Sequence, residues 1–148
     1  MTKKYLAITV LLLCICCISK TAKSQATNPL IYADVPDMSI IRVGTTYYMS
    51  STTMHMSPGL PIMKSTDLVN WKLISYAYDT LASMDELNLN NGKNIYGRGS
   101  WASCLRYHNG MFYVSTFSQT PNKTFIYSTK NMEKGCPVIN QAFGGHVA

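Results

Sequence analysis

Residues 39–51 read SIIRVGTTYYMSS, and this stretch decides the fold class. It holds two short runs of β-branched and aromatic residues on either side of Gly44-Thr45-Thr46. Two such runs around a glycine-containing turn are typical of a β-hairpin. From residue 27 onward the chain shows no sustained helical period, so we expect an all-β fold.

Outward from this hairpin, similar runs recur along the rest of the chain, at 61–64, 71–76, 101–107, 111–117 and 124–128. The Asn109-Gly110 pair favours a second tight hairpin. The two halves align at an offset of 64 residues, which places Ile62 on Ile126. Four strands per unit, repeated with a long connection over 81–99, are typical of β-propeller blades.

The same offset places Asp37 on Trp101, each just before the first strand of its unit. Because the first strand of a propeller blade lines the central axis, we expect both side chains to face one axial pocket. A carboxylate can handle protons or hydroxyls, and a flat indole packs on the apolar face of a sugar ring. The pair therefore predicts a sugar site. The alternatives are that Asp37 caps a turn after Pro36 and that Trp101 packs in the core.

The charge of the chain gives no support to a nucleic-acid partner. The 148 residues carry 13 basic and 7 acidic side chains, but four of the cations lie in the first 24 residues: Lys3, Lys4, Lys20 and Lys23. The remainder carries 9 basic against 7 acidic residues, whereas a nucleic-acid protein concentrates positive charge on its folded part. The three histidines have no metal-ligand spacing, and no nicotinamide fingerprint or phosphate-binding loop is present, so no metal or cofactor is expected.

The N-terminus reads as an export signal. A basic start is followed by the apolar run 6–18, which is too short to span a bilayer comfortably. Ser24-Gln25-Ala26 then offers small residues for cleavage after Ala26, with cleavage after Ser24 as the alternative. We expect a signal peptide at 1–26 and a secreted or periplasmic domain at 27–148, not membrane-bound after processing. A lipid anchor on one of Cys14, Cys16 and Cys17 is less favoured, because no small-residue pair precedes them.

Several motifs occur together and in order: NPLIYADVPDMSIIRVG at 28–44, IMKSTDLVNW at 62–71, GSWA at 99–102 and RYHNGMFY at 106–113. In this combination the chain resembles glycoside hydrolase family 43 over residues 28 to about 134. The second motif resembles the S-x-D-L-x-x-W run of that family. The variant is most similar to the β-xylosidase and α-L-arabinofuranosidase branch.

The resemblance implies a five-bladed β-propeller, of which this chain holds about two N-terminal blades. It also implies inverting hydrolysis of O-glycosyl bonds in xylose- or arabinose-containing polysaccharide, in which a base and an acid act from opposite sides of the sugar. By position, Asp37 matches the general base and Trp101 the aromatic wall of the sugar subsite. His55 matches the loop that lines the pocket, and Asp34 makes structural or substrate hydrogen bonds.

The general acid of the family, a Glu, has no match in this chain. Glu86 and Glu133 both lie in connections, and residues 136–148 do not match the family pattern. We therefore expect an incomplete second unit and a truncated, inactive, marginally folded and self-associating fragment. The alternatives are a non-catalytic carbohydrate-binding module and a non-functional truncation product.

The export signal gives the first testable prediction. Exported protein should begin at Gln25 or Thr27, because the small residues before each position suit signal-peptide cleavage. Intact-mass spectrometry of exported material measures this directly. A mass that retains Met1 would contradict the prediction.

Overall fold

A computed structural model describes residues 26–54, 57–120, 122–135 and 138–144. The predicted signal segment therefore lies outside the described residues, apart from Ala26. The first sheet contains β1 (Ser39–Val43), β2 (Thr46–Ser50), β3 (Gly59–Ser65) and β4 (Lys72–Tyr78). The second contains β5 (Cys104–His108), β6 (Met111–Ser118), β7 (Lys123–Thr129) and β8 (Val138–Gly144). All neighbouring strands are antiparallel, which confirms the all-β prediction.

Both predicted hairpins form with two-residue turns. Gly44 has φ 60 between β1 and β2, while Asn109 and Gly110 have φ 47 and φ 78 between β5 and β6. Turns of this kind need left-handed backbone, which glycine and asparagine adopt at little cost. Alternation then places every second residue of β6 in the core, so local sequence accounts for these elements.

The two sheets repeat the same order of strands, but the number of residues that separates equivalent strands is not the same along the sheet. Ser39 pairs with Ser50 and Cys104 with Ser115, so the first hairpins are 65 residues apart, not 64. The third strands, β3 and β7, keep the predicted offset of 64. At the offset of the first strands, Asp37 falls on Ala102 and not on Trp101.

Two other predictions about the second unit were wrong. The strand expected over 101–107 forms, but it runs from Cys104 to His108, and Ser100 ahead of it makes only isolated bridges, to Thr53 and Ser118. The unit is also not short of a strand. Strand β8 pairs with β7 from Lys123 to Ser128 and completes the sheet.

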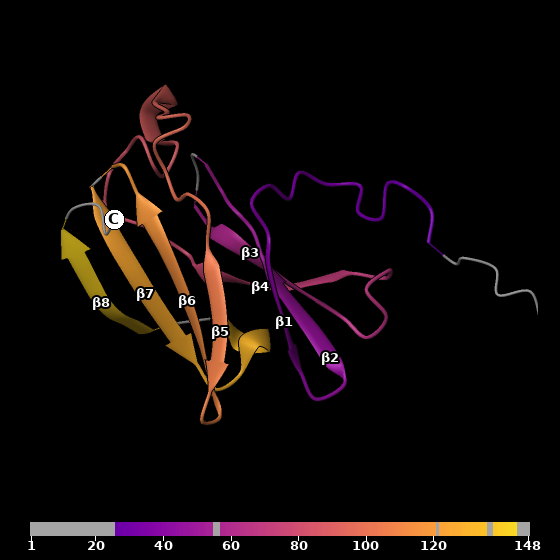
Figure 1. Ribbon diagram of the computed structural model, residues 1–148. Helices are drawn as coiled ribbons and strands as arrows, with labels where there is room; N and C mark the ends of the chain where they lie inside the picture. Colours follow the sequence, from indigo (N-terminus) through magenta and orange to yellow (C-terminus); the bar gives the residue numbers. More distant parts are fainter. Residues whose placement is uncertain (1–25, 55–56, 121, 136–137, 145–148) are drawn as a thin grey trace, which may run out of the picture.

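The two sheets pack against each other through their inner faces (Figure 1). Tyr48 meets Phe112 edge to face with ring centroids 4.9 Å apart, and Tyr78 meets Tyr127 at 5.6 Å. Strands β1 and β5 lie side by side, since the amide of Leu105 donates to Ser39 Oγ at 3.0 Å. The shared core holds Leu60, Ile62, Ala77, Tyr78, Leu81, Leu87, Leu105, Phe112, Val114, Phe125, Tyr127 and Met132.

The short helix η2 (Met132–Lys134) ties the second sheet to β3 and β4 of the first. Glu133 forms an ion pair with Lys64, and the hydroxyl of Ser75 donates to the carbonyl of Met132. A second short helix, η1 (Asn90–Gly92), lies in the connection between the sheets. Within the described residues, no helix has the length and apolar character needed to cross a membrane.

Tyr78 allows a test of the core through pH. Its side chain is 6% exposed, and burial raises the pKa of Tyr78 to about 12 even though the hydrogen bond to Ser100 acts the other way. Because the raised pKa favours the neutral phenol in the folded state, this stabilisation is complete below pH ~10 and disappears as the pH rises to about 12.

The expected loss over that interval is about 2–3 kcal/mol of unfolding free energy, measured by denaturant titration at each pH. Tyr78→Phe is the control, because it removes the titrating group and should flatten this part of the pH dependence. Equal slopes for the two proteins would show that Tyr78 ionises as it does in the unfolded chain.

Candidate functional site

Asp37 lies just before β1 in a conformation that few non-glycine residues adopt. Its φ is 51, in the left-handed region, and its side chain is exposed. The hydroxyl of Thr52 donates to Asp37 Oδ2 at 3.1 Å, and the amide of Thr52 donates to the carbonyl of Pro36, also at 3.1 Å. Backbone strain of this kind is retained where the surroundings hold it, and it concentrates at functional sites. The carboxylate is thus held in one orientation with its other oxygen available.

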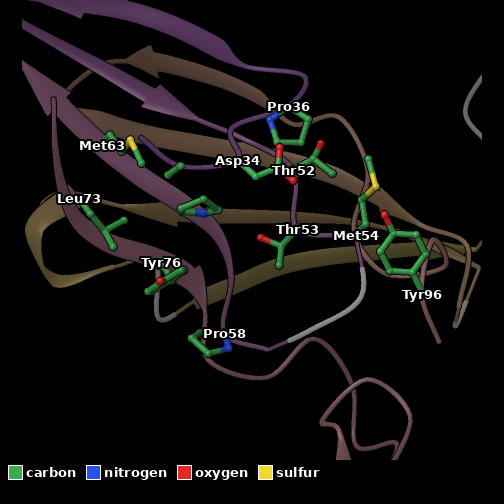
Figure 2. Close-up of a pocket in the computed structure, with 12 residues that line it drawn as sticks. Asp34, Pro36, Thr52, Thr53, Met54, Pro58, Met63, Leu73, Tyr76 and Tyr96 are labelled. Carbon is green, nitrogen blue, oxygen red and sulfur yellow. The ribbon is translucent and has the colours of Figure 1, made fainter. Parts of the chain in front are cut away.

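A pocket of about 320 Å³ lies next to this clamp. Part of its wall is the outer face of the first sheet, where Met63 pairs with Leu73. The other part is more polar and includes Asp34, Thr52 and Tyr96, as Figure 2 shows. The complete lining is Ala33, Asp34, Pro36, Thr52, Thr53, Met54, Pro58, Pro61, Met63, Leu73, Tyr76 and Tyr96. Asp34 therefore lies where a carboxylate can bind hydroxyl groups.

Trp101 lines a different pocket, of about 590 Å³, together with Ala102, Phe117, Gln119 and Asn122. Its indole N–H donates to the carbonyl of Gly97 at 3.1 Å, and the residue remains 39% exposed. Among the described residues, Asp37 is part of the lining of neither pocket. These two pockets do not test whether Asp37 and Trp101 face one axial pocket, which stays a prediction.

The buried hydroxyl of Ser100 joins the chain segments that form the two pockets. Ser100 is completely buried, accepts a hydrogen bond from the Tyr78 hydroxyl at 2.8 Å and donates to the carbonyl of Thr53, also at 2.8 Å. The amide of Gly99 adds a bond of 2.7 Å to the carbonyl of Met54. The segment that carries Trp101 is thereby fixed against the segment that carries Thr52, the partner of Asp37.

The predicted residue His55 lies outside the described residues. Both glutamates are engaged in ion pairs on the surface: Glu133 with Lys64, and Glu86 with Lys93 at 3.6 Å. The hydrogen bond from Lys64 holds the pKa of Glu133 below its usual range, whereas a general acid at neutral pH needs a raised pKa. The geometry thus does not make Glu133 a proton donor.

The S-x-D-L-x-x-W motif forms a turn. Asp67 Oδ1 accepts hydrogen bonds from the amides of Val69 at 2.9 Å and Asn70 at 2.8 Å, and the Trp71 indole donates to the carbonyl of Leu68 at 3.0 Å. The bonds that Asp67 accepts, led by those from Asn70, hold the pKa of Asp67 well below its usual range. The motif closes the connection from β3 to β4 and contributes to neither pocket.

Sequence reasoning missed Tyr96, Gln119 and Asn122. Tyr96 is 72% exposed in the long connection, and an aromatic residue in a polar loop was the available signal. Gln119 and Asn122 carried no signal for a pocket, because exposed amides in a loop are common.

The family model for glycosyl hydrolases family 43 matches residues 26–135, which is most of the chain. The chain belongs to glycosyl hydrolase family 43.

Its relatives in this family are much longer proteins. It is 44% identical over 86 residues to a β-xylosidase of Formosa agariphila, covering 58% of this chain and 14% of the relative. It is 44% identical over 93 residues to a non-reducing end α-L-arabinofuranosidase of Bacteroides ovatus, covering 63% of this chain and 17% of the relative. The chain thus spans only about one sixth of the length of the curated relatives.

Solved structures of family members also resemble this chain. A structure described as a bifunctional GH43-CE protein of Bacteroides eggerthii has a TM-score of 0.75 at 67% identity, covering 84% of this chain and 16% of that chain. A GH43_12 protein from a capybara gut metagenome has a TM-score of 0.63 at 28% identity, covering 78% of this chain and 21% of that chain. The two sheets are therefore arranged as in known members of the family.

The Ser100 connection can be tested by stability. Ser100→Ala should lower the unfolding free energy by about 1–3 kcal/mol, because the Tyr78 hydroxyl and the Thr53 carbonyl lose a buried partner. Ser83→Ala, at an exposed serine, is the matched control and should change it by less than about 0.5 kcal/mol. Combining Ser100→Ala with Tyr78→Phe should cost less than the sum of the two single changes. Strict additivity would mean that the two hydroxyls do not interact.

Proposed function

We propose that this chain is the N-terminal part of an inverting glycoside hydrolase that acts on xylose- or arabinose-containing glycans. The observation that carries the proposal is the exposed carboxylate of Asp37, held by Thr52 in a left-handed conformation. Membership of family 43 and the xylosidase and arabinofuranosidase names of its relatives support the substrate class.

In this proposal the two sheets are the first two blades of a five-bladed propeller. The side-by-side position of β1 and β5 supports it, because the first strands of neighbouring blades lie together around a propeller axis. The N-terminal apolar run, with its small residues before Thr27, supports export of the protein to the periplasm or the medium.

Asp37 would act as the general base. Its free oxygen accepts a proton from a water molecule, which then attacks the anomeric carbon from the face opposite the leaving group. The Thr52 hydroxyl fixes the direction of this carboxylate. Asp34 binds sugar hydroxyls from the adjoining pocket, and the Trp101 ring packs on an apolar sugar face.

A second candidate function is a non-catalytic carbohydrate-binding module. It is favoured by the surface ion pairs of the two glutamates, Glu133 with Lys64 and Glu86 with Lys93, because a carboxylate paired with a lysine is a poor proton donor to a leaving group. Titration of the 148-residue chain with arabinoxylo-oligosaccharides separates the two functions. Binding without release of reducing sugar supports the module. Release of xylose or arabinose by this chain supports the hydrolase and contradicts the conclusion that neither Glu86 nor Glu133 is the general acid.

The role of Asp37 can be tested in a protein extended to the length of its relatives. Asp37→Asn should lower pentose release by at least about 10²-fold and leave oligosaccharide binding intact, because the amide fills the same space but cannot take a proton. Asp79→Asn, at an exposed carboxylate just after β4, is the matched control and should keep full activity. Activity of Asp37→Asn at the level of this control would place the base elsewhere.

A further inference from the structure

We infer that copies of this chain associate head to tail, with the outer face of the first sheet of one copy packed on the outer face of the second sheet of another. The occupant of each face is thus a second copy of the chain. The inference assigns the predicted self-association to two specific surfaces. It does not rest on the proposed function, because it uses only the repeat of the two sheets and the contact between them.

The two sheets of one chain meet through unlike faces, and this contact is the template. The first sheet contributes Ser39, Ser50 and Ile62, which pair across β1, β2 and β3. Ile62 is completely buried in the shared core, and the hydroxyls of Ser50 and Ser103 are hydrogen-bonded at 2.7 Å. The second sheet contributes a row that pairs across β5, β6 and β7 and is buried throughout: Leu105, Val114 and Tyr127.

The outer face of the second sheet repeats the face that the first sheet presents to it. Equivalent residues are 65 positions apart in the first two strands and 64 in the third, so Ser39, Ser50 and Ile62 have these counterparts: Cys104, Ser115 and Ile126. The three counterparts also pair across their strands, and each is only half-buried. Alternation places them opposite the core residues on either side of them in β6 and β7.

The outer face of the first sheet carries the complementary row. Ile40, Met49, Met63 and Leu73 pair across all four strands. The first three are equivalent to the row that the second sheet packs on the first: Leu105, Val114 and Tyr127. None of the four belongs to the shared core, and Ile40 and Leu73 remain 42% and 44% exposed. An apolar row thus crosses the whole sheet and is incompletely covered by the described part of the chain.

Two tyrosines extend the match. Within one chain, Tyr48 of the first sheet meets Phe112 of the second edge to face. At the offset of 65, Tyr48 corresponds to Tyr113 on the outer face of the second sheet, and Phe112 corresponds to Tyr47 on the outer face of the first. Head-to-tail packing therefore brings Tyr113 of one copy against Tyr47 of the other, again as an aromatic pair.

A contact between unlike faces behaves differently from a symmetric one. After two copies have joined, the pair keeps one unoccupied face of each kind, so further copies can add. Blocking the same face in every copy prevents every contact. Blocking different faces in two samples still allows one contact when the samples are mixed. A symmetric contact, or pairing through strand edges, does not show this behaviour.

The test places a lysine on each face of the exported chain. Leu73→Lys alters the outer face of the first sheet, and Ile126→Lys alters that of the second. Because burying an unpaired charge is costly, each variant alone should weaken self-association by at least about 10-fold, measured by sedimentation velocity over a range of concentrations. An equimolar mixture of the two should associate again and stop at the dimer.

Leu68→Lys is the matched control. Leu68 is 42% exposed, like Leu73, but it lies in the turn between β3 and β4 and on neither row. This variant should associate as the unmodified chain does. Circular dichroism should be the same for all variants. If a face variant does not fold, Ile40→Lys replaces Leu73→Lys, and Tyr113→Lys replaces Ile126→Lys on the same faces.

Three results would overturn the inference. The first is an unmodified chain that stays monomeric at every concentration reached. The second is association of the single face variants at the strength of the Leu68→Lys control, which would place the contact elsewhere. The third is a mixture of the two face variants that stays monomeric although the unmodified chain associates, which would exclude a head-to-tail contact.

Discussion

The arrangement of both pockets depends on the buried hydroxyl of Ser100. It joins Tyr78 in β4 to the carbonyl of Thr53, and its backbone bridges Thr53 on one side and Ser118 on the other. The phenol reaches it only because residue 59 is glycine: a Cβ there would lie 2.0 Å from the Tyr78 hydroxyl oxygen. In a dry core, a hydroxyl bonded on both sides fixes its neighbours strongly, since breaking either bond leaves a buried polar group unsatisfied.

The elements that the sequence predicts correctly are those determined locally. The hairpin over 39–51 follows from alternation and from Gly44, and the second hairpin follows from Asn109-Gly110. Strand β8 could not be predicted in this way. Its pairing with β7 is a long-range interaction, and the sequence after residue 135 gave no matching pattern.

The site is only partly predictable for a similar reason. The Pro36-Asp37 pair identified the carboxylate, but its orientation depends on a left-handed backbone and on a bond from Thr52, fifteen residues away. The alignment of Asp37 with Trp101 was wrong, because the offset between the first strands is 65 residues and not 64.

Charged and uncharged side chains lie on opposite sides of the segment around Ser100. The carboxylates of Asp34 and Asp37 lie at or beside the first pocket, whereas the lining of the second carries no formal charge. A carboxylate is suited to proton transfer, but next to a bound sugar it also requires partners that keep it oriented, and Thr52 supplies one for Asp37. Neutral amides and aromatic rings need no such partner. Because Ser100 is buried and bonded to Tyr78, Thr53 and Ser118, this one segment sets the spacing of the two surfaces, and loss of either buried bond would alter both of them together.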